Sequence, residues 1–267
     1  MKLTGLKRST FYYQQKALKA GDKHAELRSM IRDTYTLHKG RYGYRRITEA
    51  IRQDGRKVSP NTIQRLMVEM RLRSLVRPKK YKSFKGEVGA AAANILDRDF
   101  KAAAPNQKWV TDVTEFNVGG GKLFLSTVMD LCTGEIVAQE MDTRPSLSMV
   151  VGMLKKALGK LSADAKPMVH SDQGWQYRMN RYQGMLTERG LVQSMSRKGN
   201  CHDNAAMESF FAVLKSEYFH LNKFASADDL KDGLAGYIDY YNHSRIKMKL
   251  GGLSPVQYRA QFTKAPH

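Results

Sequence analysis

Strand and helix signals alternate along residues 106–217, and this alternation limits the fold more than any other feature of the chain. Three apolar, β-branched runs come first, at 108–118, 122–131 and 134–142. The short turns between them predict three neighbouring antiparallel strands. Amphipathic helical spacing then alternates with short apolar runs, which gives the order β-β-β-α-β-α-β-α. This order predicts an α/β fold, a mixed five-stranded sheet with flanking helices.

Three acidic residues lie where an unpaired charge is costly. Asp112 interrupts the first apolar run, Asp172 closes the short run 167–172, and Glu208 lies on a predicted helix 35 residues after Asp172. Buried carboxylates need a compensating group. Mg²⁺ takes oxygen ligands from a few carboxylates together with substrate phosphates. The three acids therefore predict a divalent-metal site suited to phosphodiester chemistry, in which two ions flank an in-line displacement.

The predicted helix of Glu208 presents other polar groups beside its apolar stripe. Asn204 lies one turn before Glu208 and Lys215 two turns after it, on nearly the same face. Asp203 or Asn204 is expected to cap this helix, and a solvated charged edge fits the same spacing. Ser171, Ser209 and Cys201 lie near the acids, but no G-x-S-x-G elbow accompanies them, which disfavours nucleophilic hydrolysis.

Two further residue types near the acids have less specific patterns. His170 and His202 have no histidine partner at i, i+4, so a structural role is favoured over metal ligation. Trp175 and Tyr177 follow Asp172 closely, and packing is favoured for both over stacking on a base.

Positive charge is concentrated near the N-terminus. The chain carries 45 Lys and Arg against 25 Asp and Glu, a formal net charge of +20. Residues 1–100 hold 24 basic and 9 acidic side chains, whereas 101–267 hold 21 and 16. A polyanionic partner is therefore expected to meet the N-terminal third first.

Helical signals in this region form a helix-turn-helix pattern. The run 41–55 ends at Gly55, and the next helix has Ser59 as its N-cap and Pro60 at its first position. The leading turn of a second helix is the part that reads DNA in such motifs. The DNA contacts predicted on this basis are Asn61, Thr62, Gln64 and Arg65. Arg45 and Arg46 of the preceding helix are also predicted to contact DNA, although packing at the surface fits them equally. An ordinary helical bundle with a solvated basic face fits the same spacing, and the local charge favours DNA.

These signals predict a helical DNA-binding region at 1–76, a basic and Ala-rich linker at 77–105, a catalytic core at 106–220 and a helical extension at 221–267. Cys132 and Cys201 lack the spacing of a zinc site or a disulfide scaffold, which favours a reducing cytoplasm. The sequence shows no signal-peptide pattern and no apolar run of membrane-spanning length, so membrane insertion is disfavoured.

Four sequence blocks carry a family resemblance. WVTDVTEF, HSDQGWQY, SMSRKGNCHDNAAMESFFAVLKSE and YIDYYNHSRIKMKLGGLSPVQY resemble the OrfB transposases of the insertion-sequence-three family, whose ribonuclease-H-like core is shared with retroviral integrases. The segments YGYRRITEAI and SPNTIQRLM resemble the helix-turn-helix region of that family. The likeness covers most of the chain, and it includes the three acids, their spacing and the lysine seven residues after the glutamate.

The resemblance implies roles for individual residues. Asp112, Asp172 and Glu208 correspond to the catalytic metal-binding triad, and Lys215 to a contact with DNA near the scissile phosphate. Asn204, Arg197 and Lys198, in and after the same polar loop, are expected to contact DNA as well. The expected activity is cleavage at the element's 3′ ends and strand transfer by the freed 3′-hydroxyl through a circular intermediate, with Mg²⁺ as cofactor and Mn²⁺ as a substitute.

The expected partners are DNA, further copies of this chain on that DNA, and an upstream OrfA product. No heptads and no additional helix-turn-helix precede Gly5, so the chain is expected to be the OrfB product alone, in a bacterial cytoplasm at the nucleoid. Two alternatives remain open at this point: a noncatalytic helix-turn-helix regulator, which leaves the three acids unexplained, and a metal-dependent nuclease without strand transfer.

Overall fold

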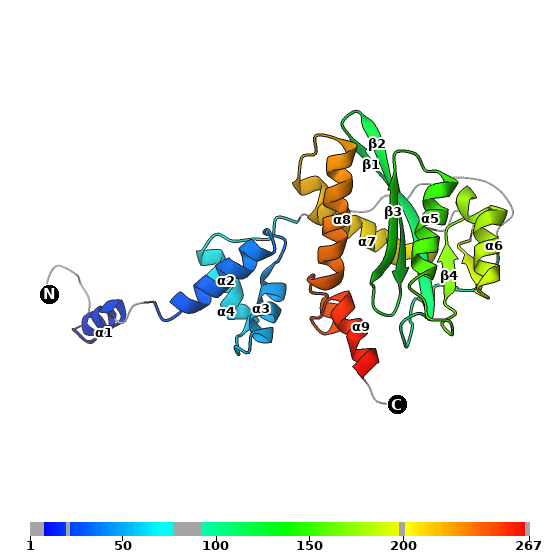
Figure 1. The fold of residues 1–267 in the computed structure, drawn as a ribbon. Coiled ribbons are helices and arrows are strands. Elements are labelled where there is room, and N and C mark those ends of the chain that lie inside the picture. Colours follow the sequence, from blue (N-terminus) through cyan, green and yellow to red (C-terminus); the bar gives the residue numbers. More distant parts are fainter. Residues whose placement is uncertain (1–7, 20–21, 77–91, 198–200, 265–267) are drawn as a thin grey trace. The chain divides into compact units, whose positions relative to one another are not determined.

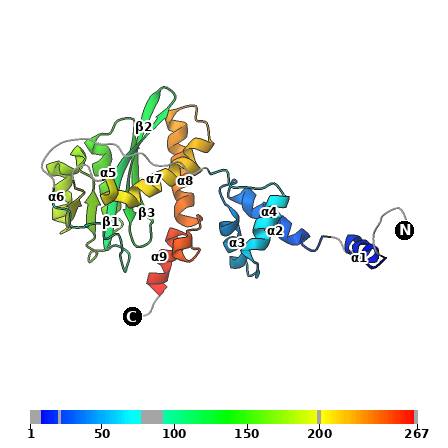
Figure 2. The same ribbon diagram turned by 180° about the vertical axis from the view of Figure 1, so that it is seen from behind.

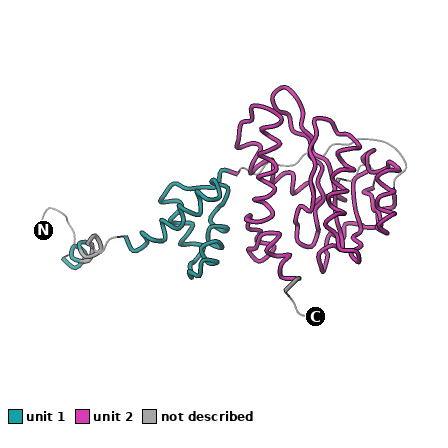
Figure 3. Tube along the Cα trace, in the orientation of Figure 1, with its two compact units in different colours: residues 1–75 teal, residues 76–267 magenta. Residues whose placement is uncertain are grey.

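The computed structural model describes residues 8–19, 22–76, 92–197 and 201–264. The chain forms two compact units, residues 1–75 and residues 76–267 (Figure 3). Within the described ranges, no helix combines the length and the apolar character that a membrane crossing requires.

The first unit is helical. Its helices are α1 (Arg8–Lys19), α2 (Ala25–Leu37), α3 (Tyr44–Gln53) and α4 (Pro60–Glu69). Helices α2, α3 and α4 pack on one another through buried side chains, which are Leu27, Ile31, Ile47, Ile51, Ile63, Leu66 and Met67. The turn from α3 to α4 passes through Gly55 at a φ of 86°, a conformation that favours glycine. Ser59 is the N-cap residue and Pro60 the first residue of α4, as the sequence predicts.

The second unit contains a mixed five-stranded sheet in the order β3-β2-β1-β4-β5. The strands are β1 (Lys108–Val118), β2 (Gly121–Asp130), β3 (Ile136–Asp142), β4 (Met168–Ser171) and β5 (Gln193–Met195). β1, β2 and β3 pair antiparallel, whereas β4 lies parallel to both β1 and β5. The predicted mixed sheet of five strands is confirmed, and β1 has the predicted bounds.

Helices cover both faces of this sheet (Figures 1 and 2). On one face lie α5 (Leu147–Leu158) and α6 (Asn180–Glu188), which share a core with Trp109 of β1. On the other lie α7 (Ala205–Glu217) and α8 (Ala227–His243), which share a core with Val110. Side chains alternate along a strand, so Asp112, two residues after Val110, belongs to the α7 face.

The smaller elements connect these helices. The 3₁₀ helices are Trp175–Arg178, Cys201–Asn204, Phe219–Leu221 and Met248–Leu250. A helix not predicted from the sequence, α9 (Pro255–Lys264), contacts α8. From residue 92 onward the predicted linker packs on the sheet unit: Leu96 is 2% exposed and lies in the core beneath α7 and α8.

A buried ion pair fastens the end of α7 to the chain beyond α8. The Arg245 guanidinium donates to Glu217 through Nε at 2.8 Å and Nη2 at 2.7 Å, and the Tyr237 hydroxyl donates to the same carboxylate at 3.0 Å. Both charged side chains are almost fully buried. The charges therefore depend on each other, because removing one leaves the other desolvated and unpaired.

Replacing only Arg245 by methionine should lower the free energy of unfolding by about 3–5 kcal/mol, the usual cost of an orphaned buried charge. The double variant Glu217→Met, Arg245→Met should lose much less, since both charges are removed together. Urea unfolding followed by circular dichroism measures both. A double variant less stable than Arg245→Met would contradict this account of α7 anchoring.

Candidate active site

Two of the predicted acids lie side by side on neighbouring parallel strands, Asp112 in the middle of β1 and Asp172 directly after the last residue of β4. The register pairs Val110 of β1 with His170 of β4. Two residues further along each chain, Asp112 comes alongside Asp172, which directly follows β4. Parallel strands are about 4.8 Å apart. The sheet itself therefore brings these two carboxylates together on the α7 face.

Backbone amides hold both carboxylates. The Val113 N–H donates to Oδ1 of Asp112 at 2.7 Å, and the Gly174 N–H donates to Oδ1 of Asp172 at 2.9 Å. A Cβ atom at position 174 would stand 2.9 Å from that same Asp172 oxygen. A larger residue at position 174 would therefore have to displace the Asp172 carboxylate from this position.

The charged forms of the acids are disfavoured where they stand. Burial raises the pKa of Asp112 well above its ordinary value, and the charges of Asp172 and Glu208 raise it further. Burial also raises the pKa of Asp172, against the opposing effect of the Gly174 N–H. These directions indicate a site with an excess of negative charge, which a cation would relieve.

Helix α7 supplies the remaining predicted groups. Glu208 lies in its first turn, close enough for its charge to act on Asp112. Lys215 is half-buried two turns later, with Nζ 5.2 Å from the centroid of the Phe116 ring. Burial lowers the pKa of Lys215, while the charges of Glu115 and Asp112 act in the opposite direction. One lysine thus stands at the edge of the acidic site.

Asn204 lies inside the protein at the start of α7. It is 4% exposed, and its Nδ2 donates to the carbonyl of Thr111 at 3.2 Å, next to Asp112. It is the N-cap residue, but its side chain makes no capping hydrogen bond. This contact fastens α7 to β1. A contact between Asn204 and DNA stays a prediction.

The aromatic and histidine residues near Asp172 differ in their surroundings. His170 is buried, and its ring nitrogens bond to the hydroxyls of Ser194 at 2.9 Å and Ser196 at 3.1 Å, in agreement with the structural role favoured above. Tyr177 is buried as predicted, whereas the packing predicted for Trp175 is wrong, because its side chain is 51% exposed. An exposed indole three residues after Asp172 is available for stacking.

Tyr177 lies near the strand acids, a position that its sequence pattern does not predict. Burial raises the pKa of its hydroxyl well above the ordinary value, and the charges of Asp112 and Asp172 contribute. Its side chain therefore lies close to both carboxylates. No signal in the sequence distinguishes it from an ordinary core tyrosine, since its spacing fits either role.

The predicted DNA contacts beyond the acids stand as follows. Arg197 binds Asp203 and Asp97, and Lys198 falls outside the described residues. In the first unit Asn61, Gln64 and Arg65 of α4 are exposed and Thr62 is half-buried. Arg45 lies over the Tyr44 ring and Arg46 over the Tyr42 ring, at 5.7 and 5.3 Å from the ring centroids. These residues stay predicted DNA contacts.

Family models match nearly the whole described chain. An integrase core domain model matches residues 102–201, a second integrase core domain model matches residues 208–262, and an HTH-like domain model matches residues 22–80. The match to an HTH-like domain agrees with the helix-turn-helix predicted from the sequence. The two core models together cover the sheet and most of α7, and with them all three acids.

Curated relatives agree with these models. The chain is 51% identical over 254 residues to the putative transposase InsK for insertion sequence element IS150 of Escherichia coli K12, covering 95% of this chain and 90% of that protein. It is 34% identical over 232 residues to the transposase InsF for insertion sequence IS3A of the same organism, covering 86% and 81%.

A solved structure shares the fold. The simian T-cell lymphotropic virus intasome in complex with PP2A regulatory subunit B56 gamma matches with a TM-score of 0.53 and 15% identity, covering 88% of this chain and 74% of that one. The sequence identity to the two bacterial transposases extends over most of each chain, which shows the family. The chain belongs to the insertion-sequence-three family of DNA transposases, which are polynucleotidyl transferases with an integrase core.

Proposed function

We propose that this transposase cleaves the 3′ ends of its insertion sequence and joins them to DNA, with Asp112, Asp172 and Glu208 as the catalytic acids. The observation that carries the proposal is the pair Asp112 and Asp172 on adjacent parallel strands, with pKa values raised by burial. Such a pair is unfavourable in the free protein and favourable once a cation binds. The position of Glu208 at the start of α7 completes the set.

The donor atoms fit magnesium. Among the described residues, no three His, Cys, Asp or Glu side chains are already arranged around one ion. Mg²⁺ is usually held by one or two carboxylates together with waters and substrate phosphates. Asp112 and Asp172 would hold it, with Glu208 beside them, and Mn²⁺ would substitute. Divalent ions held there would supply Lewis acidity for the displacement at phosphorus.

The residues of the chain position the DNA for this displacement. The attacking oxygen comes from water in cleavage and from the freed 3′-hydroxyl in strand transfer, so no covalent link to the protein is needed. Lys215, with its stem against Phe116, is placed to bind the phosphate next to the acids. The exposed Trp175 beside Asp172 offers a stacking surface to a base.

The first unit would bring DNA to this site. We assign the leading turns of α4, with Asn61, Thr62, Gln64 and Arg65, to the DNA groove, and Arg45, Arg46, Arg197 and Lys198 to the phosphate backbone. Further copies of this chain and an OrfA product are the proposed protein partners. A location in the bacterial cytoplasm at the nucleoid is part of the same proposal.

Purified full-length protein, incubated with labelled oligonucleotides that carry its element's ends and with Mg²⁺, should give both 3′-cleaved and joined products. Asp172→Asn should give neither, since the site loses one of its two strand carboxylates. Denaturing gels separate the products. Cleavage without joining would indicate a nuclease, and specific binding without any metal-dependent strand chemistry would indicate a noncatalytic regulator. Either result overturns the proposal, as does joining by Asp172→Asn.

A further inference from the structure

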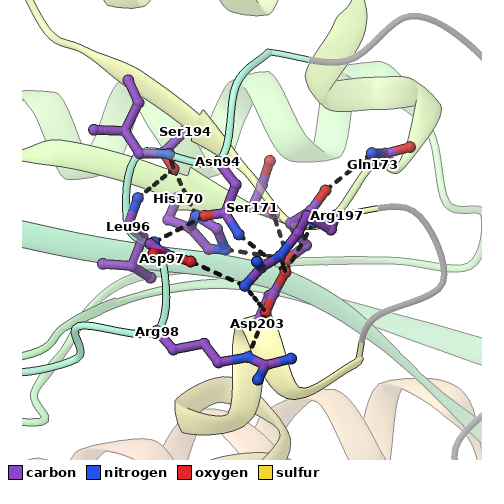
Figure 4. Close-up of polar contacts among 12 residues, drawn as sticks. Asn94, Leu96, Asp97, Arg98, His170, Ser171, Gln173, Ser194, Arg197 and Asp203 are labelled. Carbon is purple, nitrogen blue, oxygen red and sulfur yellow. Dashed lines mark hydrogen bonds and ion pairs between the residues drawn. The ribbon is translucent and has the colours of Figure 1, made fainter.

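Asp203 collects several hydrogen bonds although it was expected only as a helix cap. Its carboxylate is fully buried immediately before the start of α7. Arg197 donates to it through the backbone N–H at 2.9 Å and through Nε at 3.1 Å. Arg98 Nε donates at 2.8 Å and Asn94 Nδ2 at 3.0 Å (Figure 4). These donors hold the pKa of Asp203 at about 2 in spite of burial, so the carboxylate is charged throughout the working range.

Two of these donors belong to a segment that precedes the sheet in sequence, which we name the strap (residues 92–99). The strap runs along β5, the edge strand of the sheet. The Met195 N–H donates to the carbonyl of Ala93 at 3.2 Å, and the Leu96 N–H donates to the Ser194 hydroxyl at 3.0 Å. Because Leu96 also packs in the core, the strap is held in one position on the second unit.

The same hydrogen-bond network reaches the strand before Asp172. The Ser194 hydroxyl, which accepts the hydrogen bond from the Leu96 N–H of the strap, is also hydrogen-bonded to Nδ1 of His170 at 2.9 Å. The Gln173 side chain donates to the carbonyl of Ser196 at 2.9 Å (Figure 4). The His170 ring is fully buried between the hydroxyls of Ser194 and Ser196 and serves as a hydrogen-bonding link. β4 and the strap are thus held to the same strand, β5.

The start of α7 is therefore fixed by two consecutive side chains. Asp203 holds it to the strap and to Arg197, while Asn204 holds it to the Thr111 carbonyl of β1, adjacent to Asp112. Glu208 follows Asn204 by four residues, one helical turn. A shift at Asp203 would move Glu208 relative to the two strand carboxylates.

We propose that Asp203 is a positioning residue for the transposase reaction, which sets α7 so that Glu208 stands opposite Asp112 and Asp172. The inference rests on the proposed function of the three acids. Asp203 itself touches neither DNA nor the reacting atoms. Its carboxylate acts through the donors of the strap and of Arg197, and thereby fixes the third acid of the site.

The variant Asp203→Asn tests this role because it keeps the size of the side chain but removes the charge and replaces one acceptor oxygen by a donor. The measurement is strand joining by the full-length protein across a Mg²⁺ titration. Mutating a group that orients a metal ligand typically lowers metal affinity or activity by about 10–100-fold. The Mg²⁺ midpoint should rise by about 10- to 100-fold.

The Mg²⁺ midpoint distinguishes a role in positioning Glu208 from an effect on folding alone. A variant that only folds less well has fewer active molecules, which lowers the maximal rate and leaves the Mg²⁺ midpoint unchanged. Arg98→Ala, at a side chain that is 48% exposed, gives the same test if Asp203→Asn does not fold. Arg98→Ala should raise the Mg²⁺ midpoint by less than Asp203→Asn does. Arg98→Lys, which keeps the charge, should bring the midpoint most of the way back to the wild-type value. Lys156→Ala, which removes an exposed lysine that is ion-paired with Glu140, is the matched control without effect.

Failure of this inference is distinguishable from failure of the proposed function. If Glu208→Gln abolishes joining while Asp203→Asn and Arg98→Ala keep the wild-type Mg²⁺ midpoint, the positioning role is overturned and the acid site stands. If Glu208→Gln joins DNA as well as the wild type does, the proposed site is wrong and the inference falls with it.

Discussion

Asp112→Asn should make the metal-free transposase more stable and should abolish strand joining. The carboxylate of Asp112 is disfavoured as an anion by burial and by the charges of Asp172 and Glu208, so its removal relieves a cost to the fold. The same change removes a metal ligand. Loss of one electrostatic stabiliser in a water-excluded site costs about 10²–10³ in rate, and joining should fall by at least that factor.

Thermal unfolding in buffer with a chelator, and joining with Mg²⁺, measure the two effects of Asp112→Asn. For a unit of this size each kcal/mol moves Tm by about 2–4 °C. Glu140→Gln, a half-buried acid of β3 that is ion-paired with Lys156, is the matched control: it should not raise Tm and should keep activity. A lower Tm for Asp112→Asn together with retained joining would contradict the assignment.

Lys215→Met should slow joining and at the same time lower the Mg²⁺ concentration that half-saturates the reaction. The ammonium lies near enough to Asp112 to lower the pKa of that carboxyl. Its removal makes the site more negative, which favours a cation, and takes away the group that binds the phosphate. We expect a loss of about 10²-fold in the single-turnover rate, with a shift of the Mg²⁺ midpoint opposite to that of Asp203→Asn.

Lys215→Arg keeps the charge and should keep the wild-type midpoint, with a smaller loss of rate. Lys156→Met, on α5 and on the opposite face of the sheet, is the control for loss of one positive charge. A Lys215→Met protein with the wild-type rate, or with a raised Mg²⁺ midpoint, would show that this lysine does not act at the acidic site.

The parts of the site that follow from local pattern were predictable from the sequence. β-branched alternation gave β1 its bounds, and the helical stripe around Met207 and Phe210 placed Glu208 on a helix that packs on the sheet. Asp112 lies within β1 and Asp172 directly follows β4, so the parallel pairing of these two strands brings the acids together. The sequence pattern predicts a mixed sheet, whereas the pairing of β1 with β4 comes from the structure.

The remaining features depend on contacts between distant residues, which leave no periodic signal. The strap has no local pattern of a helix or strand, so the sequence predicts a linker there. Its hydrogen bonds run to Ser194 and Asp203, about a hundred residues later, and contacts of that kind leave no local signal. An asparagine at position 204 fits a helix cap or a DNA contact equally well in the sequence. Only the packing of α7 against β1 buries it and brings its Nδ2 to the Thr111 carbonyl. Trp175 shows the reverse case, since an aromatic side chain expected to pack is left exposed by its 3₁₀ turn.

The central claim is that the three acids hold a divalent ion, and Mn²⁺ binding to the full-length protein on DNA tests it most directly. Electron paramagnetic resonance titration reports free and bound Mn²⁺ without requiring turnover. We expect tight Mn²⁺ binding by the wild type and by Glu140→Gln. Asp112→Asn and Asp172→Asn should lose at least tenfold in affinity, and Glu208→Gln should bind more weakly as well. Wild-type Mn²⁺ affinity in Asp172→Asn would contradict the central claim.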